Sequence, residues 1–317
     1  MHKLRGKKIL ITGAAGFLGS WLAAECFAED AKLYGIDIKG PNNINIWSAF
    51  TEQGLEGSNV NELFSQNHFD IIFHLAGGAS VGDSVIDPEK DFKSIVPPTL
   101  TLIQKIKKYC VETHLILFSS AAVYGNPAIM PVKETAALHP LSPYGIHKLL
   151  VEDMVKHYSY HYGFRSSVLR IFSAFGEGLR KQLFWDVMCR YEKEYVEKKG
   201  DPIMLNLFGT GKESRDFIHC KDVAKAAVLI ATADSQESNF NVYNVAGGDE
   251  TRIKTAVEYL FQKADIQPLI KFNGESRVGD PEKWQADICK LNRLGFVATM
   301  ELQDCLNTYY TWFMKDK

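Results

Sequence analysis

Long apolar runs are missing from this sequence of 317 residues. A helix that crosses a bilayer needs roughly 20 consecutive apolar residues, and no stretch approaches that length. The basic segment 1–8 is followed by a short apolar run at 9–11 and then by Thr12 and Gly13, so we expect no signal peptide. These absences favour a protein of the cytoplasm.

Cysteine pairs with metal-binding or redox spacing are missing as well. The six cysteines are scattered without a Cys-x-x-Cys pair, so we expect reduced thiols in a cytosolic protein. His157 and His161 share a helical face, but a metal site would need further carboxylate or histidine ligands nearby in the sequence. We therefore expect a plain helix surface there and no bound metal.

An excess of charge and internal repeats are also lacking. The formal net charge is −2, and 46% hydrophobic with 23% charged residues is ordinary for a soluble globular protein. The balance gives no electrostatic reason to expect nucleic acid or an anionic membrane as a partner. Without a repeat, a low-complexity tract or an obvious flexible linker, the chain favours two lobes that share one compact body.

What is present is an alternation of short apolar segments with longer amphipathic ones. The short segments predict buried strands at 8–12, 33–37, 69–76, 114–119, 167–172 and 241–246. The longer segments predict helices at 17–29, 100–109, 144–162, 182–199 and 252–263. Strands that alternate with helices of this length indicate an α/β protein with a doubly wound parallel sheet.

Two segments break this rhythm. Residues 39–57 are polar and rich in asparagine and glycine, so we expect mostly loop there. Pro97 and Pro98 precede residues 100–109, and proline is tolerated near the start of a helix. After Phe172 the alternation weakens, and the last 70 or so residues predict a smaller, mixed α/β region.

A glycine-rich turn follows the first strand. Gly13, Gly16 and Gly19 form a Gly-x-x-Gly-x-x-Gly pattern between a predicted strand and a predicted helix. Glycines allow the sharp turn and the approach of backbone N–H groups to a pyrophosphate, and the last glycine lets helix and strand pack closely. Asp37 ends the second strand, where a carboxylate accepts hydrogen bonds from ribose hydroxyls and repels a 2′-phosphate. This favours NAD over NADP, although Lys39 nearby could soften the repulsion.

Tyr-x-x-x-Lys occurs three times, so context must choose between the matches. Tyr144 and Lys148 follow Ser120, which ends a predicted strand, and a lysine one helical turn away can lower the pKa of a tyrosine that accepts a proton. The pair at 195 and 199 lies in a highly charged helix, which indicates a solvated face. The pair at 259 and 263 lies in the C-terminal region, where the tyrosine is expected in the core. We therefore assign catalysis to Ser120, Tyr144 and Lys148.

The ordered set of motifs resembles the extended short-chain dehydrogenases/reductases of the nucleotide-sugar epimerase/dehydratase type, over nearly the whole chain. The motifs are the glycine turn, His74-Leu-Ala-Gly77, Phe118-Ser-Ser-Ala-Ala-Val-Tyr-Gly125, Ser142-Pro-Tyr-Gly-x-x-Lys148, Leu169-Arg-Ile-Phe172, the segment 208–219 with Asp222, and Asn244-Val-Ala-Gly-Gly248.

The resemblance implies a Rossmann domain at 1–175 and 212–247, and a nucleotide-sugar-binding lobe at 176–211 and 248–317. It implies NAD as cofactor, a sugar carried on a nucleoside diphosphate as substrate, and a homodimer formed by helices near 99–110 and 144–162. Expected cofactor contacts are Gly13, Gly16, Phe17, Leu18, Gly19, Asp37, Ile38, Asn59, Val60, Leu75, Ala76, Gly77, Tyr144, Lys148 and Phe172.

On the substrate side, the resemblance implies that Arg215 and Arg277 hold the diphosphate, for which a guanidinium is well shaped. Arg180 and Lys181 are further candidates, and Asp280 is a candidate for a nucleoside ribose. The complete set of expected substrate contacts is Ser120, Ser173, Arg180, Leu183, Arg215, Arg277 and Asp280.

Departures from the family pattern narrow the chemistry. Dehydratases of the family carry an Asp-Glu pair just after the catalytic serine, where this chain has Ala121 and Ala122. An elimination therefore lacks its acid and base. Asparagines usual in the family are also missing, one near Ser94 and one where Ser173 stands, which leaves the pose of the substrate open.

Three hypotheses follow. The first is a 4-epimerase that oxidises the sugar at C4 and returns the hydride to the opposite face. The second is a net dehydrogenase or keto-sugar reductase with the same triad, which releases the intermediate. The third is a non-catalytic dinucleotide-binding protein, for which Tyr144 beside Lys148 would have no use.

Overall fold

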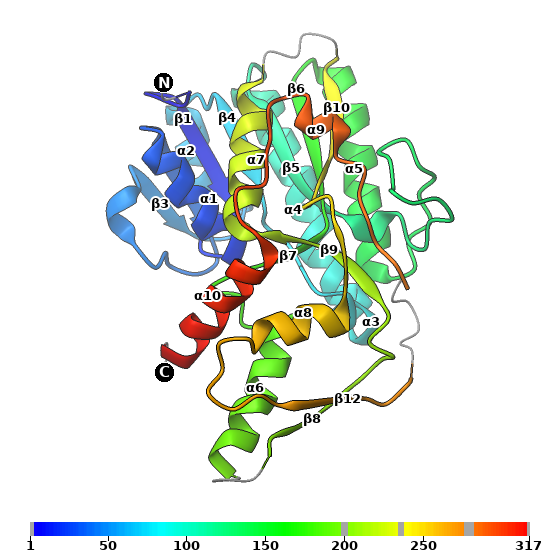
Figure 1. The fold of residues 1–317 in the computed structure, drawn as a ribbon. Coiled ribbons are helices and arrows are strands. Elements are labelled where there is room, and N and C mark those ends of the chain that lie inside the picture. Colours follow the sequence, from blue (N-terminus) through cyan, green and yellow to red (C-terminus); the bar gives the residue numbers. More distant parts are fainter. Residues whose placement is uncertain (1–2, 198–201, 234–237, 276–281, 316–317) are drawn as a thin grey trace.

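The computed structural model describes residues 3–197, 202–233, 238–275 and 282–315. Its main feature is a seven-stranded parallel sheet in the order β10-β6-β5-β4-β1-β2-β3 (Figure 1). The strands are β1 (Lys8–Thr12), β2 (Lys32–Asp37), β3 (Ala49–Glu52), β4 (Ile71–His74), β5 (His114–Ser120), β6 (Arg165–Ile171) and β10 (Phe240–Val245). β1 lies centrally, and the chain winds outward from it to both edges, which confirms the doubly wound α/β fold.

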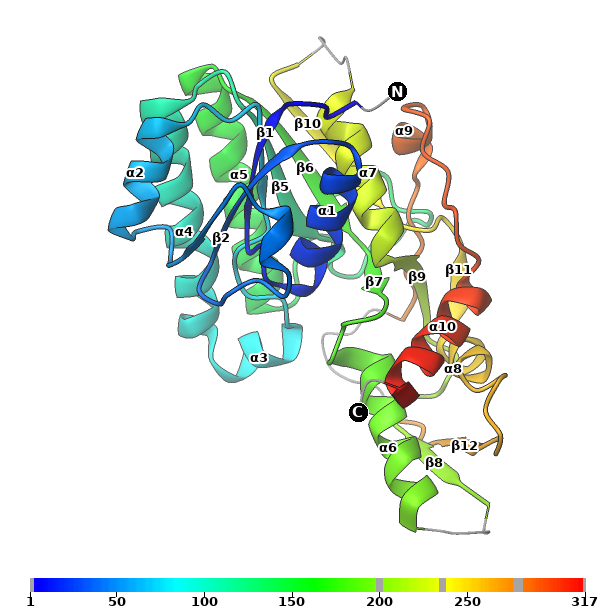
Figure 2. The same ribbon diagram turned by 90° about the vertical axis from the view of Figure 1, so that its left-hand side faces the viewer.

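Helices cover both faces of the sheet, as Figure 2 shows. On one face lie α2 (Ser58–Gln66), α4 (Pro88–Tyr109) and α5 (Pro143–Tyr162), and on the other lie α1 (Phe17–Ala28) and α7 (Cys220–Thr232). Strands in the middle of the sheet are apolar toward both layers, because each face is buried under helices. Ile9, Ile11 and Phe73 face one core, whereas Leu10 and Ile72 face the other.

A smaller lobe lies beyond the carboxyl ends of the strands (Figure 1). It contains α6 (Gln182–Glu197), α8 (Ile253–Leu260) and α10 (Leu302–Lys315), and the parallel pair β8 (Met204–Leu207) and β12 (Leu269–Phe272). A three-stranded sheet of β7 (Ser173–Phe175), β9 (Ser214–His219) and β11 (Glu250–Arg252) connects this lobe to the main sheet. The mixed C-terminal region is thus confirmed, and the exact lobe boundaries stay a prediction.

Four short helices complete the described elements: α3 (Val81–Ile86), α9 (Cys289–Asn292), and the 3-10 turns η1 (Ile44–Ile46) and η2 (Ala121–Val123). Within the described part of the chain, no helix has the length and apolar character that crossing a membrane requires.

One expectation from the sequence, the start of α4, is wrong in detail. α4 begins at Pro88, where the Asp87 side chain accepts a hydrogen bond from Lys90 N, and Pro97 and Pro98 lie inside the helix. The long apolar face of α4 packs against the sheet, and this burial outweighs the two missing N–H donors. Residues 39–57 are mostly loop, as expected, but the segment also contains η1 and β3, and β3 pairs with β2 at the sheet edge.

Candidate active site

The glycine turn joins β1 to α1 in a conformation that side chains would obstruct. Gly13 has φ +72°, and a Cβ at this position would lie 2.7 Å from Ala76 N. A Cβ on Gly19 would lie 2.2 Å from the carbonyl oxygen of Gly13. The first turn of α1 therefore packs directly on the turn, and its N-terminus faces the carboxyl edge of the sheet, where such folds bind a pyrophosphate.

Asp37 at the end of β2 is fixed by the same turn. Its Oδ2 accepts a hydrogen bond from Ala15 N at 3.0 Å, and its Oδ1 accepts one from Lys39 N at 3.1 Å. Each carboxylate oxygen retains a lone pair for a ribose hydroxyl. The Lys39 side chain is exposed and makes no described contact with the Asp37 carboxylate.

The other residues expected at the cofactor are distributed around this edge. Half-buried Phe17 lies near Gly178, Ile38 is 75% exposed, and Phe172 is buried with its N–H bonded to Val245 O. Leu18, Leu75 and Ala76 are half-buried, and Gly77 adopts φ +135° between β4 and α3. Their contacts with a cofactor stay a prediction.

Asn59 and Val60 lie on α2, unlike the other residues expected at the cofactor. Val60 is fully buried in the core under α2, and Asn59 is exposed, with its N–H bonded to Gln53 Oε1. Gln53 follows β3, whose last residue, Glu52, lies beside Asp37 in the register. Sequence reasoning missed Gln53 because β3 was not expected.

His74 at the end of β4 links the glycine turn region to α4. Thr99 donates its hydroxyl proton to Ile95 O, so the Thr99 oxygen accepts from His74 Nε2 at 3.0 Å. His74 Nδ1 then accepts from the Thr12 hydroxyl at 2.7 Å. Burial, assisted by the charge of Lys148, lowers the pKa of His74 to about 3, so this histidine is neutral.

The structure brings Ser120, Tyr144 and Lys148 together. Ser120 ends β5, and the Ser142 side chain caps α5 by accepting from Gly145 N at 3.2 Å. This cap, with Pro143 at the first helical position, places Tyr144 in the first turn of α5. The Ser120 side chain acts on the Tyr144 hydroxyl and lowers its pKa.

The protonation states of this group depend on burial. Burial raises the pKa of Tyr144 to about 12, and the Ser120 side chain opposes that shift. Burial lowers the pKa of Lys148 to about 8, against the charges of Asp91 and Glu152. Lys148 Nζ donates to Phe118 O at 3.1 Å and lies 5.7 Å from the centre of the Tyr144 ring. A phenolate at Tyr144 thus needs a nearby cation, and Lys148 supplies one.

A buried polar network supports β5 and α5 behind the candidate triad. Arg170 donates to both carboxylate oxygens of Glu152, with a closest distance of 2.7 Å, and Ser119 donates to the same carboxylate. Arg170 also donates to Tyr124, whose hydroxyl donates to Asn244 at 2.6 Å. Because every charge has a partner, the network fixes the strand that carries Ser120 relative to the helix that carries Lys148.

Of the expected substrate residues that the structure describes, those other than Ser120 lie on the side of the smaller lobe. Arg215 on β9 donates to Ser214 O and lies over the Trp284 ring, whereas Arg180 lies over the rings of Trp185 and Trp312. Lys181 Nζ donates to Ala79 O, which links the lobe to the loop after β4. Ser173 and Leu183 are half-buried, and Arg277 and Asp280 lie outside the described residues. Their roles stay predictions.

The two competing Tyr-x-x-x-Lys pairs lie elsewhere. Tyr195 is 39% exposed on α6 and stacks on Tyr191, and its partner at 199 lies outside the described residues. Tyr259 is half-buried against the core of the smaller lobe, in line with the expectation of a packing role. Both belong to the smaller lobe, away from β5 and the glycine turn.

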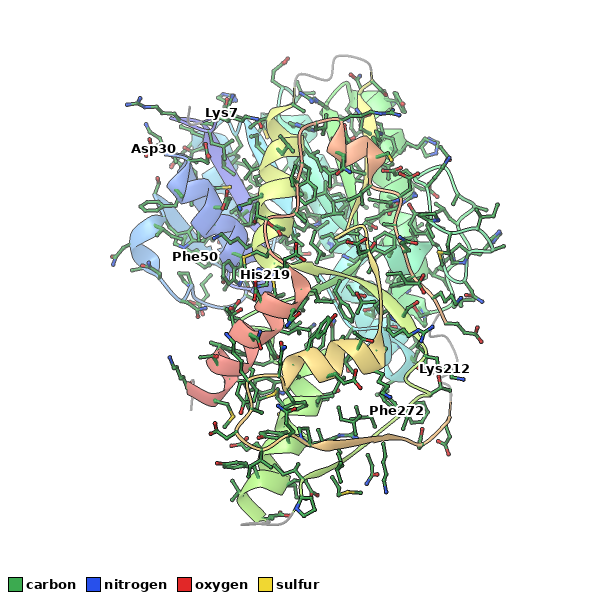
Figure 3. The ribbon with its side chains drawn as sticks, in the orientation of Figure 1. Lys7, Asp30, Phe50, Lys212, His219 and Phe272 are labelled. Carbon is green, nitrogen blue, oxygen red and sulfur yellow. The ribbon has the colours of Figure 1, made fainter. Side chains whose placement is uncertain are left out.

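Among the residues that the structure describes, one group could offer three donors to a metal ion. Glu177, His219 and Cys220 have ligand atoms within 4.8 Å of one another, near α10 and α7 where Figure 3 labels His219. However, His219 Nε2 bonds to Glu177 Oε2 at 2.9 Å, and its Nδ1 accepts from Lys221 N. Both ring nitrogens are thus engaged, and we interpret the group as a hydrogen-bonded start of α7.

Three polar residues at the site were not identified from the sequence. Ser84 of α3 accepts a hydrogen bond from Tyr144 N at 3.1 Å. Asp91 of α4 accepts one from His147 Nδ1 at 2.7 Å, beside the candidate catalytic pair. Ser84 and Asp91 are far from α5 in sequence, so only the packing of α3 and α4 on α5 reveals them. The signal for His147 was its place between Tyr144 and Lys148.

The sheet, the glycine turn and the Ser120/Tyr144/Lys148 arrangement together define an extended short-chain dehydrogenase/reductase. Residues 9–246 match the model of the NAD dependent epimerase/dehydratase family, and the chain belongs to that family.

Similar proteins carry names of 4-epimerases and complexes with nucleotide sugars. The putative UDP-glucose 4-epimerase of Methanocaldococcus jannaschii is 27% identical over 312 residues, covering 96% of this chain and 97% of that protein. The UDP-N-acetylglucosamine 4-epimerase of Methanobrevibacter ruminantium M1, in complex with UDP-N-acetylmuramic acid, is 27% identical, with a TM-score of 0.83 and 99% and 100% of the two chains covered. MoeE5 in complex with UDP-glucose and NAD is 25% identical, with a TM-score of 0.84 and 98% and 99% covered.

Proposed function

We propose that this protein is an NAD-dependent nucleotide-sugar 4-epimerase that works by reversible oxidation at C4. One observation carries the proposal: Tyr144 and Lys148 lie together in a buried site, with the Lys148 Nζ 5.7 Å from the centre of the Tyr144 ring, and the Ser120 side chain acts on the Tyr144 hydroxyl. A tyrosine so placed can take a proton from a sugar hydroxyl, and the similar 4-epimerases support C4 as the carbon.

The residues at the carboxyl edge of the sheet fit NAD. The turn at Gly13 and Gly19 leaves no room for a Cβ, which allows backbone N–H groups to approach a pyrophosphate. Asp37 suits the ribose hydroxyls and disfavours a 2′-phosphate, and similar MoeE5 is described in complex with NAD. Bound at these residues, NAD would supply the acceptor for a hydride from C4 and the donor that returns it.

The chain's own residues manage the proton. Tyr144 as phenolate takes the proton of the C4 hydroxyl while the hydride leaves carbon, and the phenol later returns that proton to the 4-keto oxygen. Ser120 donates a hydrogen bond to the same oxygen and orients it. Lys148, as ammonium, stabilises the phenolate, which burial disfavours by raising the pKa of Tyr144 to about 12.

The residues after Ser120 argue against an elimination. Ala121 and Ala122 occupy the positions where a dehydratase of the family needs an acid and a base, and both are buried in η2. Without a carboxylate there, loss of water from C5 and C6 has no proton acceptor at that position. This leaves transfer of a hydride at one carbinol.

The proposed substrate is a sugar on a nucleoside diphosphate. The similar proteins are named for UDP-glucose and UDP-N-acetylglucosamine, and Arg215 on the lobe side offers a guanidinium for phosphate oxygens. The same likeness supports a homodimer through α4 and α5, whose outer surfaces carry Phe92 (39% exposed), Ile146 (52%) and Leu150 (40%). The runner-up is a net C4 dehydrogenase or 4-keto-sugar reductase, which the same triad would serve.

One experiment separates these functions. The purified protein is incubated with NAD and, in turn, with UDP-glucose and UDP-N-acetylglucosamine, while NADH absorbance and the NMR spectrum of the sugar are followed. A new C4 epimer without net NADH supports the epimerase, and net NADH supports the dehydrogenase. A Tyr144→Phe variant that retained full activity would contradict both enzyme functions.

A further inference from the structure

Asp91 is a buried acid beside the candidate catalytic pair that the mechanism above does not use. It lies on α4 and is 8% exposed. Its Oδ1 lies against the loop after β4, since a Cβ on Gly78 would come within 2.6 Å of that oxygen. Its Oδ2 accepts a hydrogen bond from His147 Nδ1 at 2.7 Å. The carboxylate is therefore enclosed between α4, α5 and the Gly77–Gly78 backbone.

Two buried acids act on Lys148, and they differ in their other partners. Glu152 is already neutralised by Arg170, which bonds both of its carboxylate oxygens. Asp91 accepts a hydrogen bond from His147 Nδ1. The charge of Lys148 also interacts with Asp91, and a nearby cation stabilises a buried carboxylate.

The other ionisable groups around Asp91 and Lys148 do not supply a positive charge to balance Asp91. His74 at the end of β4 is neutral, because burial lowers its pKa to about 3. Tyr144 would itself become negative during the reaction. Arg170 on β6 is engaged by Glu152 and Tyr124. Among these groups of α4, α5, β4 and β6, Lys148 is therefore the cation left to balance Asp91, and Asp91 in turn favours the ammonium form of Lys148.

We propose that Asp91 is a positioning residue for the proton-transfer pair: its buried carboxylate, oriented by His147 and enclosed between α4, α5 and the Gly78 backbone, supports the charged form of Lys148. This rests on the proposed function of Tyr144 and Lys148. Asp91 acts through Lys148 and does not touch the reacting atoms.

The direction of the effect follows from charge. A negative neighbour favours the protonated forms of both Tyr144 and Lys148, and Asp91 raises the pKa of each. Because the two groups titrate as a coupled pair, Asp91→Asn displaces the whole pH profile of kcat/KM toward lower pH. It also lowers the maximum, by about tenfold or more, because Lys148 is then less often an ammonium when Tyr144 is a phenolate.

Three variants make the test specific. Asp91→Glu restores the charge and is expected to return the profile toward that of the wild type. His147→Asn retains a hydrogen-bond donor for Asp91. We expect it to change the maximum of kcat/KM without displacing the pH profile. Asp153→Asn removes an exposed acid from the same helix α5 and should leave the profile in place. A loss of activity in Asp91→Asn without any displacement would overturn the proposal.

A titration without substrate keeps the result independent of the proposed function. Phenolate absorbance is followed for the NAD-loaded wild type and Asp91→Asn, each minus its Tyr144→Phe counterpart. We expect the Tyr144 titration to move to lower pH in Asp91→Asn even if no sugar is turned over. An unmoved titration contradicts the proposal. If Asp91→Asn does not fold, the carboxyl NMR titrations of Lys148→Met and the wild type are compared instead. We expect one aspartate to titrate at higher pH in Lys148→Met. Aspartate titrations that are the same in both proteins would overturn the proposal.

Discussion

Lys148 Nζ donates a hydrogen bond to the carbonyl oxygen of Phe118 at 3.1 Å. Phe118 lies two residues before Ser120 on β5, so this bond ties the lysine of the helix to the strand that carries the serine. Burial lowers the pKa of Lys148 to about 8, which makes its charge sensitive to conditions close to neutrality. The proposed chemistry therefore depends on a lysine that is held in place but easily deprotonated.

The first prediction concerns pH. Below its pKa of about 8 Lys148 is an ammonium that stabilises the Tyr144 phenolate, and as pH rises through that value the charge is lost. We expect kcat to fall on the alkaline side of about pH 8, measured from about pH 6 to about pH 10. Lys148→Met should lower kcat by about a hundredfold or more and abolish this alkaline limb. An alkaline limb that persisted in Lys148→Met would assign it to another group.

The second prediction concerns the glycine turn. In Gly19→Ala the new Cβ would lie 2.2 Å from Gly13 O, so the turn must shift. We expect the free energy of unfolding to fall by about 1–3 kcal/mol and NAD to bind more than about tenfold more weakly in calorimetry. In the control Gly82→Ala no atom lies within 4 Å of the Cβ, and stability should change by less than about 1 kcal/mol. Equal effects of the two variants would contradict the packing argument.

The third prediction concerns the choice of dinucleotide. Asp37→Asn keeps an oxygen for Ala15 N but removes the charge that suits ribose hydroxyls and repels a 2′-phosphate. We expect NAD affinity to fall about tenfold and the preference over NADP to shrink, as measured by calorimetry with both cofactors. Lys39→Gln is the matched control and should affect NADP alone. If Asp37→Asn left the ratio of the two affinities unchanged, Asp37 would not be the selecting residue.

Much of the fold could be predicted because the buried strands are continuous apolar runs. β1, β4 and β5 are covered on both faces, so their sequences carry a strong signal. β3 was missed because it is four residues long, lies at the sheet edge and contains polar residues. The start of α4 was misplaced because Pro97 and Pro98 were interpreted as its beginning, whereas Asp87 caps the helix ten residues earlier.

The part of the site that lies in short local motifs was predictable from the sequence. Ser120, Tyr144 and Lys148 lie in two short motifs, and the cap at Ser142 fixes the start of α5. Asp91 meets His147 across 56 positions of sequence. No local pattern reports such a contact, because it depends on how α4 packs against α5.

The fourth prediction concerns stability away from the site. Burial lowers the pKa of His114 to about 3, and both ring nitrogens are hydrogen-bonded, to Ala231 O and to Ser167. In the unfolded chain the pKa is about 6.5, so the stability that depends on neutral His114 is present above that pH and lost as pH falls toward 3.

His114→Gln tests this linkage. At about pH 7 it should be less stable than the wild type by about 1–3 kcal/mol in urea unfolding, because buried hydrogen bonds are lost. At about pH 4.5 the gap should narrow by about 2 kcal/mol, because the variant no longer has a buried imidazole that resists protonation. A gap of the same size at both pH values would show that His114 does not titrate on unfolding.

The central claim is that hydride leaves C4 and returns to C4 while Tyr144 carries the proton. The most direct test uses a UDP-sugar deuterated at C4, followed by NMR after incubation with the NAD-loaded protein. The account predicts a C4 epimer that retains deuterium at C4, and a rate that is lower by about a thousandfold in Tyr144→Phe. Deuterium lost to solvent from the epimer, or no epimer from any UDP-sugar tested, would contradict it.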